Sequence, residues 1–420
     1  MRNSNLDYHI SKPNFYIEIL AEVKTLTRRV LVIIPDLTGG GAERVATNLA
    51  TCLAQEDDTE VILAVEHITA DNYGATVKTV NLNMPKDKGK LKIFWHIKLT
   101  RKLKKIKKEY EITHSISFLS EPSLANVLSK NKDMVIVSER NYVSAQKNNI
   151  LKAKEKWLLK KADKVVALSE MVRQDLIQNF KVLSDKAVTI YNPCYVERIL
   201  KQSKEEILSK EEIAFFRDNA GKVVITAGRL VDQKGQWYLI RAFSAVTKRN
   251  PGAKLIILGQ GENKKYLTDL IKELELEDSV FLWGYKDNPY PYLYYADLFA
   301  FSSVYEGLGN IIVECMACGL PTVSVDCKFG PKELLNPNSD LKVQVSKITY
   351  GEYGVLVPTV SGQKYSAADP LTEAEECLSE AILNLLNNDS LRLHYREKIV
   401  ERAKDFNPHI ITKQWLALMR

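Results

Sequence analysis

Residues 302–319 read Ser-Ser-Val-Tyr-Glu-Gly-Leu-Gly-Asn-Ile-Ile-Val-Glu-Cys-Met-Ala-Cys-Gly, and this stretch decides the expected fold. It follows the apolar run Leu298 to Phe301, which is typical of a buried parallel strand. Gly307 and Gly309 permit a tight loop, and the small residues from Asn310 to Cys318 then predict a helix. A strand, a glycine loop and a helix in this order predict an α/β sheet whose ligands bind beside the carboxyl ends of its strands.

Two carboxylates stand eight positions apart in this stretch, and each suits a different part of a nucleotide sugar. Glu306, at the end of the strand, is the carboxylate for the sugar, and the helix start beside it has free N–H groups and a positive dipole that attract an anion such as phosphate. Glu314 lies inside the helix, where a carboxylate can accept hydrogen bonds from the two hydroxyls of a ribose. The pair therefore predicts a nucleotide-sugar site. The alternative is that both are solvated glutamates at a helix end.

Further strands followed by glycine turns occur in the second half of the chain. Residues 226–235 read Thr-Ala-Gly-Arg-Leu-Val-Asp-Gln-Lys-Gly and carry Arg229 and Lys234. The paired donors of a guanidinium and the point charge of an ammonium suit a diphosphate leaving group that gains negative charge. The alternative is two surface cations. Residues 255–261 and 280–285 are two more such units.

The second half resembles the signature of the retaining glycosyltransferases of family 4 at Gly307, Gly309, Glu314, Ala317, Cys318, Gly319 and Pro321. The resemblance covers roughly residues 29–420 and implies the GT-B fold, an α/β architecture of two Rossmann-like domains facing a cleft. It implies catalytic roles for Arg229, Lys234 and Glu306. It also implies a donor-binding set that consists of Gly40, Gly41, Gly228, Gly259, Tyr285, Gly307, Leu308, Gly309, Asn310 and Glu314.

The first half carries a triple-glycine loop after its first strand. Residues 31–35 are an apolar strand, and residues 39–44 read Gly-Gly-Gly-Ala-Glu-Arg, so the backbone can approach a ligand closely. Arg44 stands where a dinucleotide fingerprint needs its third glycine, and the Gly-Lys-Ser/Thr of a Walker loop is missing. In the family this loop faces the cleft and contacts the donor phosphates or the acceptor. The alternative is a flexible turn.

The sequence departs from the family on the acceptor side. Many members carry a histidine that faces the sugar's anomeric centre, at the end of the strand that here comprises residues 135–137. This chain continues instead with Ser138, Glu139, Arg140 and Asn141. We therefore place Glu139, Arg140 and Asn141 on the acceptor side and leave open which of them replaces the histidine.

Length and pattern indicate two domains. A chain of 420 residues exceeds what one hydrophobic core organises, and 45% hydrophobic with 26% charged residues is ordinary for a globular protein. We place the boundary near Pro193. The chain then divides into an extension (1–28), an acceptor domain (29–195), a donor domain (196–408) and a last helix (409–420), which in the family crosses back to the first domain.

The net charge of +7 is concentrated in one segment, because residues 86–108 hold eleven Lys or Arg and only Asp87 opposes them. Five apolar residues recur there at helical spacing: Leu91, Trp95, Leu99, Leu103 and Ile106. Such a helix can bind an anionic membrane surface, with about 1 kcal/mol from each nearby cation. The alternative is a basic helix that packs its apolar stripe on its own domain. Nucleic acid is not expected as a partner, since no recognised binding motif is present.

Six scattered cysteines and the lack of a signal peptide predict a cytoplasmic protein, peripheral on the inner face of the cell membrane. Cys315 and Cys318 match Cys-x-x-Cys, but no second pair at zinc spacing accompanies them. No Asp-x-Asp pair follows a strand either. We therefore expect no metal and no other cofactor, with cationic side chains in place of a divalent ion.

These observations predict a retaining enzyme that moves a hexose or N-acetylhexosamine from a nucleotide sugar, expected to be UDP-linked. The expected acceptor is a lipid-linked or polysaccharide chain in capsule, exopolysaccharide or lipopolysaccharide biosynthesis. The expected mechanism is front-face displacement, in which the protein mainly positions and neutralises the reactants. The alternatives are a soluble glucan- or sucrose-type synthase and a non-catalytic nucleotide-sugar-binding or regulatory subunit.

Overall fold

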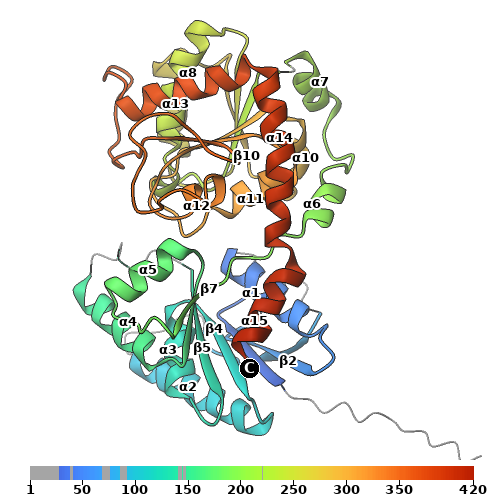
Figure 1. Cartoon of the computed structure of the whole chain (residues 1–420), viewed down its shortest axis with the longest axis vertical. Helices are drawn as coiled ribbons and strands as arrows, with labels where there is room; N and C mark the ends of the chain where they lie inside the picture. Colours follow the sequence, from blue (N-terminus) through green and yellow to red (C-terminus); the bar gives the residue numbers. More distant parts are fainter. Residues whose placement is uncertain are drawn as a thin grey trace, which may run out of the picture.

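The computed structural model describes residues 28–37, 41–68, 76–85, 92–140, 144, 148–219 and 221–420, which form two α/β domains (Figure 1). The first domain contains β1 (Arg28–Ile34), α1 (Gly41–Leu53), β2 (Thr59–Val65), β3 (Lys78–Asn81), α2 (Lys92–Glu109), β4 (His114–Phe118), α3 (Ser120–Leu128), β5 (Met134–Glu139), α4 (Asn149–Lys161), β6 (Lys164–Ala167), α5 (Glu170–Gln178) and β7 (Ala187–Thr189). The predicted extension, residues 1–28, lies outside the described residues except for Arg28.

The second domain contains α6 (Val196–Gln202), α7 (Lys210–Asp218), β8 (Val223–Ala227), η2 (Asp232–Lys234), α8 (Gln236–Arg249), β9 (Lys254–Leu258), α9 (Lys264–Glu273), β10 (Val280–Gly284), α10 (Tyr290–Tyr295), β11 (Leu298–Phe301), α11 (Asn310–Ala317), β12 (Thr322–Val325), α12 (Pro331–Leu335), β13 (Thr349–Tyr350), β14 (Val355–Val357), α13 (Glu373–Leu386) and α14 (Asp389–Ala403). The chain continues through η3 (Lys404–Phe406) into α15 (Pro408–Leu418).

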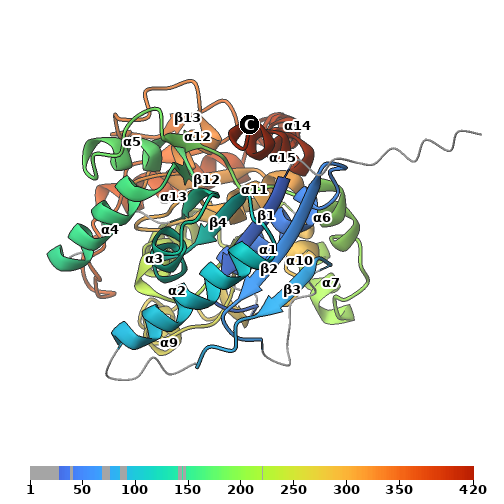
Figure 2. The ribbon, with the colours of Figure 1, turned by 90° about the horizontal axis from the view of Figure 1, so that it is seen from below.

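The first domain is built on a parallel sheet with the strand order β3-β2-β1-β4-β5-β6-β7. Its inner strand β1 is buried on both faces, and successive residues point into different cores. Val30, Val32 and Ile34 pack with α1, whereas Leu31 and Ile33 pack with α2. Helices α2, α3 and α4 lie side by side on that second face (Figure 2).

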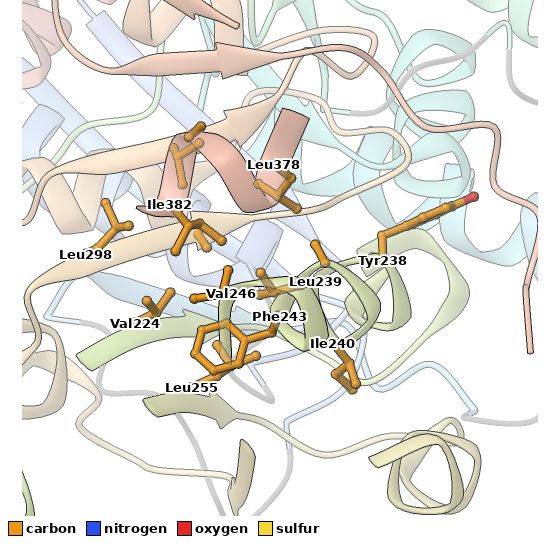
Figure 3. Close-up of a cluster of buried hydrophobic side chains, with 14 of the residues drawn as sticks. Val224, Tyr238, Leu239, Ile240, Phe243, Val246, Leu255, Leu298, Leu378 and Ile382 are labelled. Carbon is orange, nitrogen blue, oxygen red and sulfur yellow. The ribbon is translucent and has the colours of Figure 1, made fainter. Parts of the chain in front are cut away.

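The second sheet has the order β10-β9-β8-β11-β12-β14-β13, and only the β13–β14 pair is antiparallel. Helices α8 and α13 pack on one face of this sheet. Figure 3 shows their contact layer, in which strand residues meet helix residues at Val224, Leu255, Leu298, Leu239, Phe243, Val246, Leu378 and Ile382. The sequence prediction of two Rossmann-like domains in the GT-B arrangement is confirmed.

The two domains are joined twice. The chain passes from β7 into α6, and it returns through the long helix α14 to α15, which lies beside α1 in the first domain (Figure 1). Ile411, Trp415 and Met419 are buried in the core of the first domain. The two connections touch where the Cys194 N–H donates to the Phe406 carbonyl at 2.7 Å.

The apolar stripe of the basic segment faces the protein interior. Trp95, Leu99, Leu103 and Ile106 on α2 are all less than a tenth exposed, and they pack against the first sheet. The prediction that this stripe lies on a membrane is therefore wrong, and the alternative of packing on its own domain holds. Leu91 and the start of the segment lie outside the described residues. Within the described ranges, no helix is long and apolar enough to cross a bilayer.

Candidate active site

The strand order of the second sheet reverses between β8 and β11. These strands are neighbours, but the chain leaves β8 toward β9 on one side and leaves β11 toward β12 on the other. Such a reversal of strand order opens a ligand crevice in parallel sheets. Arg229 and Lys234 follow β8, and Glu306 follows β11. All three predicted catalytic residues therefore lie at this edge of the sheet.

Lys234 and Glu306 form an ion pair in the crevice. The Lys234 Nζ lies 2.5 Å from Glu306 Oε1, with the two side chains 18% and 9% exposed. The Nζ also lies 5.5 Å from the centre of the Phe301 ring. A backbone bond from Val304 N–H to the Gln233 carbonyl (2.8 Å) fixes the two loops relative to each other. The ammonium is thus held in place and largely shielded from water at the carboxyl edge of the sheet, a position that suits contact with an anionic group.

Helix α11 presents its N-terminus to the same crevice. Gly309 precedes the helix with φ of +91°, and no side chain of the described residues caps the first turn. Leu308 is buried and anchors the loop. Arg229 is exposed, and its guanidinium makes no hydrogen bond or ion pair with any described residue. Free N–H groups and an unpaired guanidinium together can hold an anion.

Glu314 lies deeper along α11, close to a cation from the other domain. Burial raises the pKa of Glu314 to about 7, and the charge of Arg44 on α1 opposes that rise. Burial and Glu314 also raise the pKa of the neighbouring Tyr290 hydroxyl. Sequence reasoning treated Arg44 only as a departure from a dinucleotide fingerprint. In the structure, Arg44 is a cation of the first domain that acts on Glu314, the residue predicted to bind the ribose.

The glycine turns predicted to contact the donor lie side by side. Gly228 N–H donates to the Leu258 carbonyl (2.9 Å), and Gly259 N–H donates to the Gly284 carbonyl (2.7 Å). Tyr285 follows Gly284 and is 58% exposed, so its ring is not part of the hydrophobic core. In the first domain, Gly41 is the first residue of α1, and Gly40 lies outside the described residues.

The predicted acceptor side meets the signature segment across the cleft. A Cβ on Gly307 would stand 2.5 Å from the Arg140 carbonyl, so this approach of the two domains requires glycine. The Arg140 guanidinium lies 4.9 Å from the Phe118 ring and donates to Asn192 Oδ1. Burial lowers its pKa to about 9, at which it stays charged at neutral pH. Glu139 ends β5 beside it, and Asn141 lies outside the described residues.

Sequence reasoning missed the residues that connect the two domains beside this site. Asn192 donates to Asn310 Oδ1 at 2.8 Å, which links Arg140 to the start of α11. Glu333 accepts the Glu170 N–H (2.7 Å) and the Tyr191 hydroxyl (2.6 Å). Tyr191 and Asn192 end the first domain and Glu333 follows a Gly-Pro turn, but no local pattern of the sequence marks their contacts. Only the fold brings these segments together.

No metal site is formed by the described residues, since no group of three or more His, Cys, Asp or Glu side chains converges there. Cys315 and Cys318 are buried between α11 and its surroundings. Burial raises the pKa of the Cys318 thiol to about 12, so it stays protonated at neutral pH. The Cys-x-x-Cys match thus reflects helix packing.

Two Rossmann-like domains, each built on a parallel sheet, are the architecture of the GT-B class of glycosyltransferases. Two family profiles also identify the chain as a glycosyltransferase. The profile described as Glycosyltransferase Family 4 matches residues 39–198, and that described as Glycosyl transferases group 1 matches residues 209–348. The chain belongs to the glycosyltransferases of family 4, and it is an enzyme.

Relatives span most of the chain. An uncharacterized glycosyltransferase of Methanocaldococcus jannaschii is 34% identical over 79% of this chain and 86% of the relative. A Campylobacter jejuni protein, N-acetylgalactosamine-N,N'-diacetylbacillosaminyl-diphospho-undecaprenol 4-alpha-N-acetylgalactosaminyltransferase, is 29% identical over 90% of this chain and 95% of its own length. The Erwinia amylovora amylovoran biosynthesis glycosyltransferase AmsD is 23% identical, covering 92% and 98%.

Solved structures share the fold. Anabaena Alr3699/HepE in complex with UDP and glucose superposes with a TM-score of 0.69 at 18% identity, and the match covers 93% of this chain and 99% of that protein. At this identity the match supports the architecture alone.

Proposed function

We propose that the enzyme transfers a hexose or N-acetylhexosamine from a UDP-sugar, with retention of configuration, to a lipid-linked or polysaccharide acceptor. The names of two relatives support this proposal. The Campylobacter protein is named as an N-acetylgalactosaminyltransferase for a diphospho-undecaprenol-linked substrate, and the Erwinia protein is named for amylovoran biosynthesis. Capsule, exopolysaccharide and lipopolysaccharide assembly are the processes in which such an acceptor would be built.

The observation that carries the proposal is the Lys234–Glu306 pair beside Arg229 and the start of α11. In the proposed reaction the bond between the anomeric carbon and the donor phosphate breaks, while a bond to an acceptor hydroxyl oxygen forms on the same face. The departing phosphate takes the acceptor's proton. Arg229, Lys234 and the α11 N–H groups stabilise the negative charge that develops on the diphosphate. Glu306 holds Lys234 in place and lies where the sugar would bind.

We further propose that the reaction needs no divalent metal. A guanidinium and an ammonium at one diphosphate supply positive charge that a metal ion would otherwise provide. The support is the placement of Arg229 and Lys234 at the same sheet edge.

The outer face of α2 is the proposed contact with an anionic membrane on its cytoplasmic side. Ile93 and Phe94 are each 64% exposed, and Ile97 is 40% exposed. Exposed cations continue the same helical face toward the C-terminal end of α2: Lys98, Arg101, Lys104, Lys105 and Lys108. Exposed apolar side chains beside cations suit the headgroup region of an anionic leaflet. This face is opposite the buried stripe on which the sequence prediction relied.

The test is hydrolysis and transfer with a panel of nucleotide sugars, with EDTA present and a glycolipid extract as acceptor. We expect one UDP-sugar to be turned over in EDTA, and the product anomer, read by NMR, to match the donor. Glu306→Ala should abolish turnover. Turnover that stops in EDTA and returns with Mg²⁺ would overturn metal independence, and an inverted anomer would overturn retention.

A further inference from the structure

A cavity lies between α5 of the first domain and the loops that follow β12 and α12 of the second. Its volume is about 380 Å³, within the range of roughly 300–1,000 Å³ that small-molecule sites occupy. The residues used below are Asp175, Gln178, Lys328, Lys332, Lys342 and Glu333. No residue of the predicted site lines this cavity.

The cavity shares a wall with the active site. The Lys328 carbonyl accepts the Glu306 N–H at 3.4 Å, and Tyr305 and Lys328 form a β-bridge. A Cβ on Gly330 would stand 1.9 Å from the Leu308 carbonyl, so the two loops touch backbone to backbone. One side of the loop from Asp326 to Gly330 thus supports the signature segment, and its other side lines the cavity. A molecule extending from the reaction centre past this loop would enter the cavity.

Asp175 lines the cavity and has a carboxylate oxygen without a hydrogen-bond partner among the described residues. Its residue is 6% exposed, and Oδ1 accepts from the Ser144 hydroxyl and the Asn179 amide, both at 2.6 Å. Oδ2 is buried and has no hydrogen-bond partner among the described residues. An unsatisfied buried carboxylate oxygen costs free energy unless a ligand donates to it. This oxygen is therefore the feature of the cavity that calls for a ligand.

The other charges around the cavity are largely balanced. The Glu333 carboxylate accepts hydrogen bonds from the Glu170 N–H at the start of α5 and from the Tyr191 hydroxyl. Lys332 donates to the Val343 carbonyl and lies 3.7 Å from the Asp326 carboxylate. Lys328 and Lys342 are exposed cations of the same lining, and Asp175 is an anion of that lining. A lining with both donors and acceptors, and without an excess of one sign, suits the hydroxyl groups of a neutral sugar better than an anion.

We propose that this cavity binds a sugar residue of the acceptor chain, one or more units away from the hydroxyl that reacts, with a sugar hydroxyl donating to Asp175 Oδ2. The proposal rests on the proposed function, because it assigns a place to part of the acceptor. It makes Asp175 a determinant of acceptor specificity, and it assigns Asp175 no role in donor cleavage.

Asp175→Asn tests the proposal with little change of shape. The amide keeps one oxygen for Ser144 and Asn179 but turns the Oδ2 position into a donor. For the glycolipid fraction that accepts label, we expect KM to rise on the order of tenfold, as for loss of a hydrogen bond to a charged group. We expect kcat, and hydrolysis of the donor without acceptor, to stay within twofold.

Gln178→Trp is the second variant, because Gln178 is exposed at the rim and a tryptophan there would fill the cavity without touching Asp175's bonds. It should raise KM for the acceptor in the same way. Asp185→Asn, an exposed carboxylate outside the cavity, is the matched control. An unchanged KM in both variants would overturn the inference, and so would a parallel loss of donor hydrolysis. Absence of donor cleavage in the unaltered protein would instead overturn the proposed function.

Discussion

Arg229 is the site residue that can be removed with least effect on the fold, because its side chain is exposed and unpaired among the described residues. We expect Arg229→Ala to lower kcat/KM by about 10²-fold, the typical loss when one donor to a developing negative charge is deleted. The melting temperature should stay within 1–2 °C, roughly the effect of an ordinary surface substitution. Steady-state kinetics and thermal unfolding measure the two effects.

Arg217→Ala is the matched control, since Arg217 is an exposed arginine of the same domain whose Nε lies 2.9 Å from the neighbouring Asp218 carboxylate. It should leave kcat/KM unchanged. Equal activity of the Arg229 and Arg217 variants would remove Arg229 from the catalytic set.

The raised pKa of Glu314 predicts that the stability of the nucleotide-free protein depends on pH. Its folded-state pKa of about 7 lies above the ordinary value of a glutamate, so between about pH 4.5 and 7 the folded state holds a proton that the unfolded state releases. The contribution of this group to the free energy of unfolding therefore falls as pH rises through that window. Glu314→Gln removes the titration, so its melting temperature should rise relative to the unaltered protein between pH 5 and pH 8.

Glu277 is exposed, so the melting temperature of Glu277→Gln should differ from that of the unaltered protein by the same amount at every pH. If the melting temperature of Glu314→Gln also differs by a constant amount, the Glu314 carboxyl group is not held in the protonated form.

At the residue scale the sequence was most informative where chemistry and local backbone coincide. Glu306 and Lys234 could be named because each lies in a glycine-containing loop that follows a strand, and the fold brings such strand ends together. Asn192 and Glu333 could not, because their partners lie 118 and more than 140 positions away along the chain. No local pattern marks a hydrogen bond of that range.

Helix α2 shows what periodicity leaves undetermined at the element scale. A stripe of Trp95, Leu99, Leu103 and Ile106 predicts one buried face, but the same spacing fits burial in lipid or in protein. In the structure the stripe is buried in protein, because it packs against Leu31, Ile33 and Ile62. The strands ending near the site were easier to predict. Continuous apolar runs such as residues 298–301 occur where both faces of a sheet are covered.

The two faces of α2 give opposite predictions for substitutions on this helix. Phe94→Ser should leave stability within about 0.5 kcal/mol and reduce sedimentation with vesicles that contain phosphatidylglycerol. Trp95→Ala should instead destabilise the fold by about 3–5 kcal/mol, as expected for a buried aromatic residue.

Leu393→Ser on α14 is the matched control for the vesicle assay, because Leu393 is 57% exposed on the other domain. Vesicle binding that is unaffected by Phe94→Ser would argue against α2 as the membrane contact.

At the scale of the whole molecule, Glu333 links the second domain to the first through hydrogen bonds. Its carboxylate accepts from the start of α5 and from Tyr191, and burial raises its pKa. Glu333→Ala leaves these donors without their partner. We expect the melting temperature to fall by several degrees, about 2–4 °C for each kcal/mol lost in domains of this size. We also expect a larger radius of gyration by X-ray scattering as the cleft opens.

Tyr191→Phe removes one of these hydrogen bonds and should produce a smaller loss of about 1 kcal/mol. Glu277→Ala should change neither quantity. A Glu333→Ala protein with an unchanged radius of gyration would show that other contacts suffice to hold the domains together.

The passage of the chain back through α14 into α15 has a consequence for how the protein is made. The first domain emerges from the ribosome first, yet its core lacks Ile411 and Trp415 until nearly the whole chain has been translated. Until then β1 and α1 leave an apolar surface uncovered, and the second domain must fold while its predecessor is incomplete. A fragment ending near residue 195 should therefore aggregate when expressed alone. Supplying a peptide of residues 404–420 in trans should restore its solubility.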